Sequence, residues 1–367
     1  MTKIGLRNLW FQLHKWIGLI LAVLIIPISI TGAALVWHDP ILEWMHPERH
    51  HATSAPVLPL TAYVDSARAA LGEGERLSRI ELRKGEPVVV MASKPSRGRP
   101  QRTTFYLDPA TAQLIARENS SQGVFQVMHV LHGSLMIPGV GRTIVGWIGV
   151  AMLLSSISGL WLWWPTVGSW VRGLRWRRHR NLDTNLHHMM GFWIALPLFV
   201  LSLTGVWISF PQVFAGFDGG APKGPSPMML MMRAKPLETT ATPLDQVVEH
   251  ARAAAPGEVR SVMWPTDMKP EWTVQIAAKG PPATVTVSDK DGSAQLAPAP
   301  AGPQGQTIAR TMRQIHDGQG LPFVWQLIVF LGGLIPAILA ITGIIMWWRA
   351  RGWRGQLAER KRAKALA

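Results

Sequence analysis

Hydrophobic positions gather into four stretches that contain no Asp, Glu, Lys or Arg: residues 16–37, 143–171, 189–217 and 318–348. Each stretch includes an apolar run close to the roughly 20 residues that a helix needs to cross about 30 Å of hydrocarbon. The pattern therefore predicts four membrane-spanning helices. The first stretch continues through Leu35, Val36 and Trp37 rather than through a small-residue cleavage site, so we expect a retained helix and not a cleaved signal peptide.

The two long segments between the predicted spans are more polar and change their periodicity. In the first, a helix-like stretch at 61–71 turns through Gly72 and Gly74 into residues that alternate between apolar and polar, as strands with one buried face do. The second segment repeats this order and turns at Asp291-Gly292. The pattern predicts two small α+β modules with short antiparallel sheets, and Pro/Gly-rich linkers at 219–227 and 297–305.

These elements predict a chain of eight consecutive parts. In order, they are an N-terminal segment with the first span (1–38), a first module (39–125), a histidine segment with the second span (126–171), a basic loop (172–188), the third span (189–217), a second module (218–310), a histidine segment with the fourth span (311–348) and a basic tail (349–367).

Charge is distributed so that it orients the predicted spans. Residues 1–15, 172–188 and 349–367 together carry 15 Lys and Arg against two Asp and Glu, which accounts for +13 of the net charge of +15. Because basic residues accumulate on the cytoplasmic side of membrane proteins, we expect both termini in the cytoplasm and both modules in the periplasm of a bacterial inner membrane. The same distribution disfavours nucleic-acid binding, since the basic residues flank spans.

The chain has no Cys, which excludes disulfides, iron–sulfur clusters, thiolate metal sites and covalent c-type haem. A redox centre would depend on His, Met or carboxylate ligands. None of the four charge-free stretches contains an Asp or Glu that could couple ion movement, so an ion-coupled transporter is disfavoured.

Histidines and glycines recur at matched spacing in the two halves of the chain, as an internal duplication would leave them. In the first and third spans, a histidine is followed by a glycine at +4 and a Thr-Gly dipeptide at +17 and +18: His14, Gly18, Thr31 and Gly32, then His187, Gly191, Thr204 and Gly205. A second histidine is followed by a glycine at +27 and a Trp pair at +31 and +32: His132, Gly159, Trp163 and Trp164, then His316, Gly343, Trp347 and Trp348. The repeat predicts two helix–module–helix units in one orientation, related by a pseudo-twofold axis along the membrane normal.

That symmetry predicts two histidine pairs, His14 with His187 near the cytoplasmic face and His132 with His316 near the outer face. Histidine is rare in membrane helices and usually faces the bundle interior with a partner. Two facing neutral imidazoles suit the axial positions of a haem iron in a helix bundle. The alternative is that the histidines are interfacial and bond to lipid or backbone. A zinc or copper site is disfavoured, because zinc prefers four ligands in one place.

The glycines at +4 favour the haem hypothesis. Gly18 and Gly191 lie one turn along the same face as their histidines, and they lack the side chain that would keep a porphyrin from lying flat. Aromatic and Met residues nearby are candidates to line the macrocycle: Trp10, Trp16, Met189 and Trp193.

Other residues are secondary candidates. His129 lies one turn before His132, and it could replace that residue or share the outer site. His188 adjoins His187 but points about 100° away, so His187 is preferred as the ligand. Arg142 is a candidate partner for a haem propionate. One last group of residues has two interpretations. They could bind a metal, or they could lie in a solvated loop or make an interfacial contact: His38, His46, His50, His51 and the Met-rich segment 226–235.

The motifs LHKWIGL…ITG, LHGSL…GR…SGLWLWWP, LHHMMGFW…LTG and IHDGQG…TGIIMWW resemble those of the PepSY-associated transmembrane family over essentially the whole chain. The resemblance implies two paired transmembrane/PepSY units that hold b-type haems through histidines, here His14, His132, His187 and His316. The family includes iron-regulated inner-membrane proteins and ferric-siderophore reductases. PepSY domains elsewhere are associated with peptidase inhibition.

We therefore expect an oxidoreductase with two haems b per chain, which moves electrons from quinol or a cytoplasmic reductase to a ferric siderophore or other ferric chelate outside. Reduction to Fe(II) would release the metal, because it weakens the hold of hard oxygen donors. The rival hypothesis is a non-enzymatic PepSY membrane module that regulates a peptidase or partner complex. The sequence offers no convincing catalytic triad or carboxylate pair, and electron transfer needs none.

Overall fold

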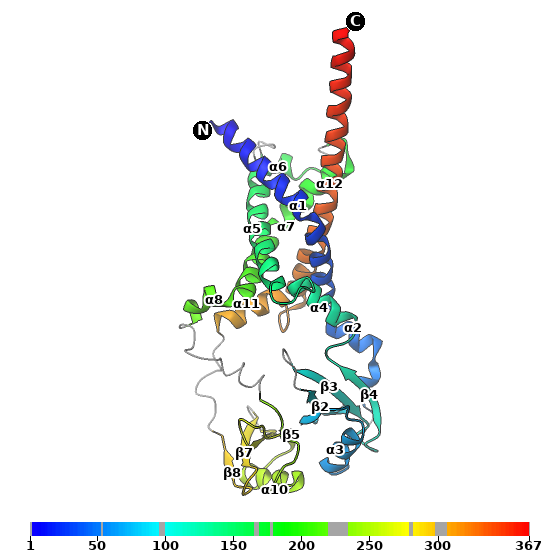
Figure 1. The fold of residues 1–367 in the computed structure, drawn as a ribbon, viewed down its shortest axis with the longest axis vertical. Coiled ribbons are helices and arrows are strands. Elements are labelled where there is room, and N and C mark those ends of the chain that lie inside the picture. Colours follow the sequence, from blue (N-terminus) through cyan, green and yellow to red (C-terminus); the bar gives the residue numbers. More distant parts are fainter. Residues whose placement is uncertain are drawn as a thin grey trace. The chain divides into compact units, whose positions relative to one another are not determined.

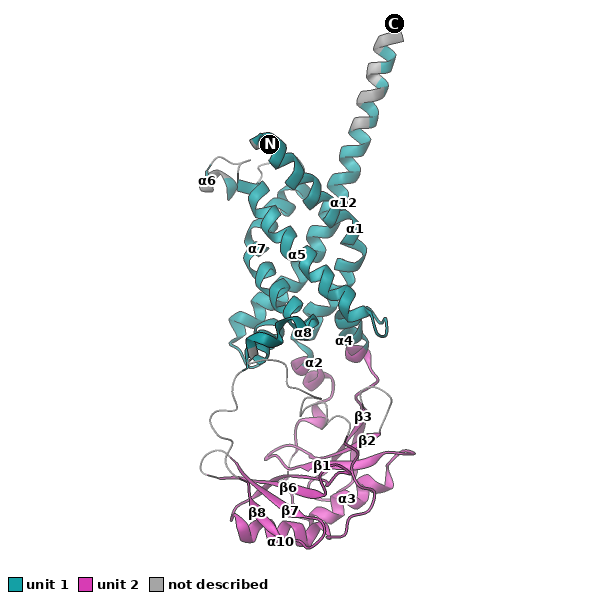
Figure 2. Ribbon diagram, turned by 60° about the vertical axis from the view of Figure 1, so that its left-hand side comes forward, with its two compact units in different colours: residues 1–38, 127–221, 306–367 teal, residues 39–126, 222–305 magenta. Residues whose placement is uncertain are grey.

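The computed structural model describes residues 2–52, 54–94, 100–164, 169–176, 179–218, 234–278, 282–297 and 307–366. The chain forms two compact units (Figure 2). The helical unit comprises residues 1–38, 127–221 and 306–367, and the sheet unit comprises residues 39–126 and 222–305. Each unit is therefore assembled from both halves of the sequence.

Four long helices make up most of the helical unit: α1 (Lys3–Val36), α5 (Gly141–Trp163), α7 (Leu182–Ser209) and α12 (Phe323–Leu366) (Figure 1). Each contains a stretch long and apolar enough to cross a membrane, and only 22–33% of the apolar window in each is buried. Apolar side chains thus remain on the outward surfaces, where hydrocarbon can surround them. The prediction of four helices long and apolar enough to span a membrane is confirmed.

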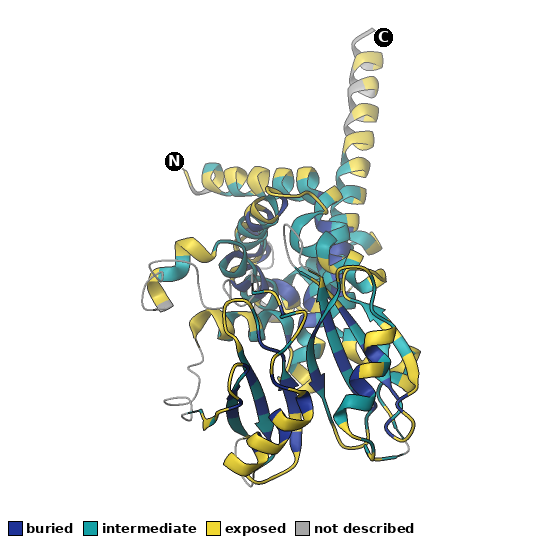
Figure 3. Cartoon of the chain, turned by 60° about the horizontal axis from the view of Figure 1, so that its bottom comes forward, coloured by how far each residue is buried: buried dark blue, intermediate teal, exposed yellow. Residues whose placement is uncertain are grey.

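Two of these helices are longer than the charge-free stretches that predicted them. α1 begins at Lys3 and is capped by Thr2, whose hydroxyl accepts a hydrogen bond of 3.2 Å from the Gly5 N–H. α12 continues through the basic tail to Leu366. Most residues of this extension whose burial the structure describes are exposed (Figure 3). Charge marks where the hydrocarbon ends, whereas a helix continues in water as long as its residues favour helix.

Small residues let the spans approach one another. A Cβ added at Gly333 of α12 would lie 2.9 Å from the Ala33 N of α1, and one at Gly149 of α5 would lie 3.0 Å from Val206 Cγ2 of α7. The two contacts occupy equivalent positions of the repeat. Helices in a membrane associate through such close packing, because lipid provides no hydrophobic driving force between them. α1 thus packs against α12, and α5 against α7.

Short helices lead into the second span of each half. α4 (Val124–Ser134) precedes α5, and α11 (Ile308–Asp317) precedes α12. α11 ends at Gly318, whose φ of 73° is left-handed, a conformation that favours glycine at helix ends. α4 is followed by Leu135 and Met136, which are also left-handed, with φ of 52° and 59°. The chain therefore turns sharply between each short helix and its span. Other short helices in the described residues are α2 (His38–Met45), η1 (Pro47–Arg49), α6 (Trp170–Gly173), α8 (Pro211–Phe214) and η3 (Ala215–Asp218).

The sheet unit contains one antiparallel sheet of eight strands in the order β4-β3-β2-β1-β5-β6-β7-β8. Its strands are β1 (Arg76–Glu81), β2 (Val88–Lys94), β3 (Gln101–Leu107), β4 (Leu114–Asn119), β5 (Val259–Met263), β6 (Glu271–Ile276), β7 (Ala283–Ser288) and β8 (Ala294–Leu296). β1 and β5 form the seam between the two halves, where Ile80 is paired with Val262. From this seam, the strands follow one another in chain order in both directions.

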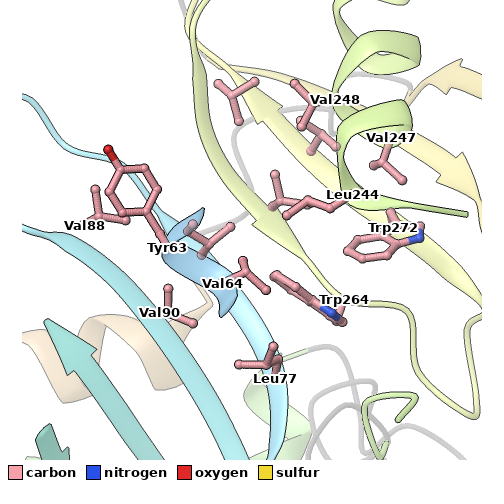
Figure 4. Packing of buried hydrophobic residues seen from close by; sticks show 14 of the residues in the cluster. Tyr63, Val64, Leu77, Val88, Val90, Leu244, Val247, Val248, Trp264 and Trp272 are labelled. Atoms are coloured by element: carbon pink, nitrogen blue, oxygen red, sulfur yellow. The ribbon is translucent and has the colours of Figure 1, made fainter. Parts of the chain in front are cut away.

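Helices α3 (Leu60–Ala69) and α10 (Leu244–Ala254) complete the core of the sheet unit. Figure 4 shows Tyr63 of α3 and Val247 of α10 among the buried side chains of the strands. Trp264 and Trp272 lie in the same core, with ring centroids 5.1 Å apart. In β2, β3, β6 and β7, alternate residues are buried in this core, as the period of two predicts.

The sequence predicts two separate sheets, and that expectation is wrong. Ile80 and Val262, which meet at the seam, are both 0% exposed. Alternation within a strand marks its buried face, but it does not say which other strand will pair with its edge. Pairing β1 with β5 covers two edges that separate modules would leave open to other chains.

Some predicted features lie outside the described residues. The linker at 219–227 does so entirely, and of the linker at 297–305 only Ala297 is described. The Met-rich segment 226–235 is described only at Ala234 and Lys235, and the basic loop 172–188 is described except for residues 177–178.

Candidate functional site

The helical unit brings His14 of α1 and His187 of α7 together. Their ring centroids are 6.4 Å apart and their planes are inclined by 85°. Both residues are half-buried. We call them the inner pair. They come from the first and third spans, at equivalent positions of the repeat.

A second pair forms at the other end of the spans. His132 of α4 and His316 of α11 have ring centroids 6.1 Å apart and planes inclined by 42°. We call them the outer pair. The four histidines therefore meet in the two combinations that the internal repeat predicts, although they come from four different helices.

The spacing within both pairs fits two imidazoles bound to one iron. A metal–imidazole nitrogen bond is about 2 Å and the ring centroid lies roughly 1 Å beyond that nitrogen, so two imidazoles on opposite sides of one metal have centroids about 6 Å apart. The observed separations are 6.4 and 6.1 Å. A haem would supply the other iron ligands from its macrocycle, and the two imidazoles of either pair would hold its iron.

Two imidazoles alone are a poor site for a bare metal ion. Within the described part of the chain, no group of three or more His, Cys, Asp or Glu side chains could hold a metal ion. Zinc is almost always bound by at least three protein ligands. The donor sets present therefore suit haem better than zinc.

The histidines of the inner pair bond through Nδ1 to hydroxyl groups on the neighbouring spans. His14 Nδ1 lies 3.0 Å from Ser158 Oγ of α5, and His187 Nδ1 lies 3.0 Å from Thr342 Oγ1 of α12. Each hydroxyl donates its own hydrogen to a main-chain carbonyl of its helix, at 3.2 and 2.8 Å. The hydroxyl oxygen must then accept from the imidazole, so Nδ1 carries the hydrogen and Nε2 keeps its lone pair for a metal.

The histidines of the outer pair bond to main-chain carbonyls. His132 Nδ1 donates to Ile28 O of α1 at 2.8 Å, and His316 Nδ1 lies 3.1 Å from Leu201 O of α7. His316 Nδ1 also lies 3.0 Å from the hydroxyl of Thr204. A carbonyl oxygen can only accept, so these imidazoles also carry their hydrogen on Nδ1.

Burial keeps the outer pair neutral. Desolvation lowers the pKa of His316 to about 4, and the partner imidazole of His132 contributes in the same direction. Desolvation also lowers the pKa of His132. A metal binds the neutral form of histidine, so burial favours the state that a ligand needs.

Each histidine ring lies against a glycine of the helix that holds its Nδ1. A Cβ added at Gly32 would lie 2.6 Å from His132 Cε1, and one at Gly205 would lie 3.1 Å from His316 Cε1. At the inner pair, the corresponding distances are 3.1 Å from Gly159 to His14 Cε1 and 3.5 Å from Gly343 to His187 Cε1. A hydroxyl residue precedes each of these glycines, in the dipeptides Thr31-Gly32, Ser158-Gly159, Thr204-Gly205 and Thr342-Gly343.

The glycines at +4 face open space. A Cβ added at Gly18 would meet nothing within 4 Å, and one at Gly191 would meet only Leu339 Cδ2 at 4.0 Å. By contrast, Trp16 and Trp193 are 49% and 64% exposed, and each lies at least 120° around its helix from the histidine of the inner pair. These two Trp residues lie on other sides of their helices from the histidines, and their role in lining a macrocycle stays a prediction.

The secondary candidates lie beside the pairs. The ring of His188 lies beside that of His179, with centroids 4.8 Å apart and planes inclined by 38°, while His187 meets His14. Arg142 is exposed and donates to Ile208 O at the end of α7. His129 is exposed on α4 and interacts electrostatically with Asp317, the residue after His316.

The histidines that follow the first span belong to the sheet unit or its border. His46 Nδ1 lies 3.2 Å from Glu48, and His51 Nε2 lies 3.2 Å from Glu43. His38 begins α2, and His50 is half-buried after η1. Within the described residues, these side chains form no group of three or more that could hold a metal.

A model of the PepSY-associated TM region matches residues 11–350. The chain belongs to this family. The match confirms the resemblance that the motifs indicated, and it covers all four spans, both histidine pairs and both halves of the sheet unit. Among curated proteins, none matches this PepSY-associated TM protein.

Sequence reasoning found the histidines of this PepSY-associated TM protein but missed their partners. Ser158 and Thr342 lie at Nδ1 of the inner pair, and the carbonyls of Ile28 and Leu201 lie at Nδ1 of the outer pair. The Thr204 hydroxyl also lies at Nδ1 of His316. A hydroxyl–glycine dipeptide in all four spans was the available signal for the side-chain partners. A carbonyl leaves no signal, because every residue has one.

Proposed function

We propose that this PepSY-associated TM protein is a di-haem b-type oxidoreductase of a bacterial inner membrane, which passes electrons outward to reduce a ferric siderophore or other ferric chelate. The observation that carries the proposal is the geometry of the two histidine pairs, with centroids 6.4 and 6.1 Å apart. In all four imidazoles, a hydrogen bond engages Nδ1 and leaves Nε2 for a metal. Interfacial histidines bonded to lipid would not need a partner imidazole at this distance.

The inner pair would hold one haem and the outer pair the other. A bound haem supplies an iron that gains and loses single electrons. The residues of the chain orient the imidazoles through their Nδ1 acceptors, seat the rings on glycines and surround them with apolar spans that exclude water. Reducing Fe(III) to Fe(II) in the substrate consumes one electron and needs no proton donor, so the site requires no acid or base.

The two pairs are separated by most of the membrane thickness. Gly32 contacts the outer pair, and His14 of the inner pair lies 18 residues earlier in the same helix. At 1.5 Å per residue, that is about 27 Å along α1, which is close to the roughly 30 Å of bilayer hydrocarbon. An electron that passes from one pair to the other therefore crosses the membrane.

We infer the direction of electron transfer from the distribution of charged residues, and the symmetry of the helical unit from matched contacts in the two halves. The basic residues of the termini and of the short loop support an inner pair on the cytoplasmic side, where quinol or a cytoplasmic reductase would supply electrons, and a sheet unit in the periplasm. Equivalent residues of the repeat bond to equivalent histidines. Ser158 and Thr342 lie at Nδ1 of the inner pair, and Ile28 O and Leu201 O lie at Nδ1 of the outer pair. This equivalence supports a pseudo-twofold axis along the membrane normal.

A visible spectrum of the detergent-purified full chain tests the proposal, with haem quantified as the pyridine haemochrome. We expect about two low-spin, reducible haems per chain. His14→Ala and His316→Ala should each remove about one haem, whereas the loop variant His46→Ala should retain both. The dithionite-reduced protein should be reoxidised when a ferric trihydroxamate is added.

Two outcomes would contradict the proposal in different ways. A protein without a Soret band would favour a non-enzymatic module that regulates a peptidase or partner complex. Full haem occupancy in both His14→Ala and His316→Ala would show that haem binds elsewhere in the chain.

A further inference from the structure

His187 of the inner pair lies close to the beginning of its helix. α7 begins at Leu182, five residues before His187, and its N-cap residue Asn181 makes no side-chain capping hydrogen bond. His14, by contrast, lies eleven residues inside α1, which begins at Lys3. The first turn of a helix has unpaired N–H groups and opens more readily than the interior. The position of His187 therefore needs a support that the position of His14 does not.

An ion pair fastens the first turn of α7 to α12. Arg349 Nη1 donates to Asp183 Oδ1 at 2.7 Å, and Arg349 Nη2 donates to Asp183 Oδ2 at 2.6 Å. The same Nη2 donates to the hydroxyl of Thr184 at 3.0 Å, and the side chain of Asp183 is only 14% exposed. Exposed ion pairs usually contribute little, but two parallel bonds between a guanidinium and a carboxylate fix both the distance and the orientation of the groups that they join.

This ion pair lies beside the contact between His187 and Thr342. Asp183 lies four residues before His187 in α7. Arg349 lies seven residues after Thr342 in α12. These intervals are close to one and two helical turns, so each charged residue shares a face of its helix with a residue of the contact. The ion pair and the 3.0 Å contact from His187 Nδ1 to Thr342 Oγ1 therefore lie along one line between α7 and α12.

The first half of the repeat lacks an equivalent ion pair. Trp10 and Pro165 occupy the positions equivalent to the two charged residues, and neither side chain carries a charge. A single, longer bond joins α1 to α5 near this end, from Arg7 Nη2 to Leu162 O at 3.4 Å. The ion pair therefore supports the imidazole that lies near a helix end, and not the one that lies deep within its helix.

We propose that Asp183 and Arg349 are positioning residues for His187, and that their ion pair holds its imidazole at the spacing that two axial ligands of one iron require. The inference rests on the proposed haem-binding function. Without the ion pair, the first turn of α7 separates from α12 and the ring of His187 moves from its place 6.4 Å from the ring of His14. His14 stays in place, so the inner site keeps one firm ligand and holds the other loosely.

Haem ligation in a His316→Ala background tests the inference, because only the inner pair is intact there. In Asp183→Asn and in Arg349→Gln, we expect part of the bound haem to change from low-spin to high-spin by electron paramagnetic resonance. Transfer of haem to apomyoglobin should become about 10- to 100-fold faster, the range by which loss of groups that orient a metal ligand lowers affinity. Arg7→Gln is the matched control and should change neither measurement.

The double variant shows whether the two residues act as a pair. Asp183→Asn combined with Arg349→Gln should resemble either single variant in spin state and in the rate of haem transfer, because each single variant already removes the interaction. Additive effects of the two substitutions would overturn the inference, since they would show that each residue acts through a different partner.

A measurement that does not depend on haem follows the movement of α7 itself. The chain contains no Cys, so spin labels can be attached at Leu182→Cys and Trp353→Cys, where the natural residues are 64% and 63% exposed. The distribution of distances between the two labels should broaden in Asp183→Asn and remain unchanged in Arg7→Gln.

The outcomes separate this inference from the proposed function. Absence of haem from the wild-type protein would overturn both. Haem binding by the wild type, with the same spin state and the same rate of haem transfer in Asp183→Asn, would overturn the inference alone. In that case, a broadened distribution of label distances would show that the ion pair supports α7 without positioning His187.

Discussion

The imidazole of His132 lies directly against Gly32, and no side chain fits between them. A Cβ on Gly32 would lie 2.6 Å from Cε1 and 2.8 Å from Nδ1 of His132. The His132 ring lies there because its Nδ1 donates a hydrogen bond to Ile28 O, which lies one turn before Gly32 in α1. A looser contact of the same kind occurs at the inner pair, where a Cβ on Gly343 would lie 3.5 Å from His187 Cε1, which is ordinary van der Waals contact.

Gly32→Ala should therefore disrupt the outer site, because the new methyl group displaces the ring and breaks its bond to Ile28 O. We expect the variant to retain about one haem per chain by pyridine haemochrome. Gly343→Ala is the matched control and should retain about two, since its methyl group fits without movement. Equal haem content in the two variants would show that these glycines do not position the histidines.

Gly18→Phe should block the inner site without unfolding the spans. A Cβ at Gly18 would meet nothing within 4 Å, so the backbone tolerates a side chain, but a bulky ring would occupy the face on which a porphyrin would lie. We expect loss of about one haem, measured together with the expression level and the thermal stability of the purified protein. Gly18→Ala should behave as the wild type. Two haems in Gly18→Phe would place the macrocycle on another face of α1.

The stability of the sheet unit should depend on the charge of Glu75. Burial opposes its ionisation, but hydrogen bonds from the Thr103 hydroxyl and from Gly72 N–H at 2.7 Å, with Arg117 at 3.0 Å, lower its pKa below the ordinary 4.5. Because the folded pKa is the lower one, the carboxylate stabilises the fold above the unfolded pKa, and this contribution is lost as pH falls through the folded pKa.

Glu75→Gln should therefore unfold at a lower temperature at neutral pH and lose less stability on acidification. Thermal unfolding at neutral pH and at several pH values below 4.5 measures both effects. Glu73→Gln, at an exposed residue nearby, is the control. The same acid dependence in Glu75→Gln as in the wild type would assign that dependence to other groups.

The seam should make the two halves of the sheet unfold together. Ile80 of β1 is fully buried and paired with Val262 of β5, so Ile80→Ala should cost about 2–5 kcal/mol. Amide hydrogen exchange should then accelerate in β6, across the seam, as well as in β2. Ile115→Ala, at a residue 38% exposed on edge strand β4, should have little effect on either strand. Exchange that accelerates only in the first half would show that the halves unfold independently.

Periodicity and spacing were sufficient for the spans and for the histidine pairs. An apolar stretch without charge must bury its backbone hydrogen bonds in a helix to cross a bilayer, so residues 16–37 or 318–348 predict their structure without reference to the rest of the chain. The pairing of His14 with His187 followed from the repeat, because a duplicated chain places equivalent residues at equivalent depths. These conclusions need only local pattern and one symmetry argument.

The joining of the two modules at β1 and β5, and the acceptors of the four imidazoles, became visible only in the tertiary structure. A strand's sequence encodes its buried face but not its neighbour, so nothing local distinguishes two four-stranded sheets from one of eight. Ile28 O and Leu201 O have no residue type to mark them, and they bind histidines because α4 and α11 fold back onto the spans. The sequence by itself determined which residues lie in the membrane and which are equivalent, because these depend on local apolarity and duplication. Packing decided what each imidazole donates to, because that depends on which helices meet.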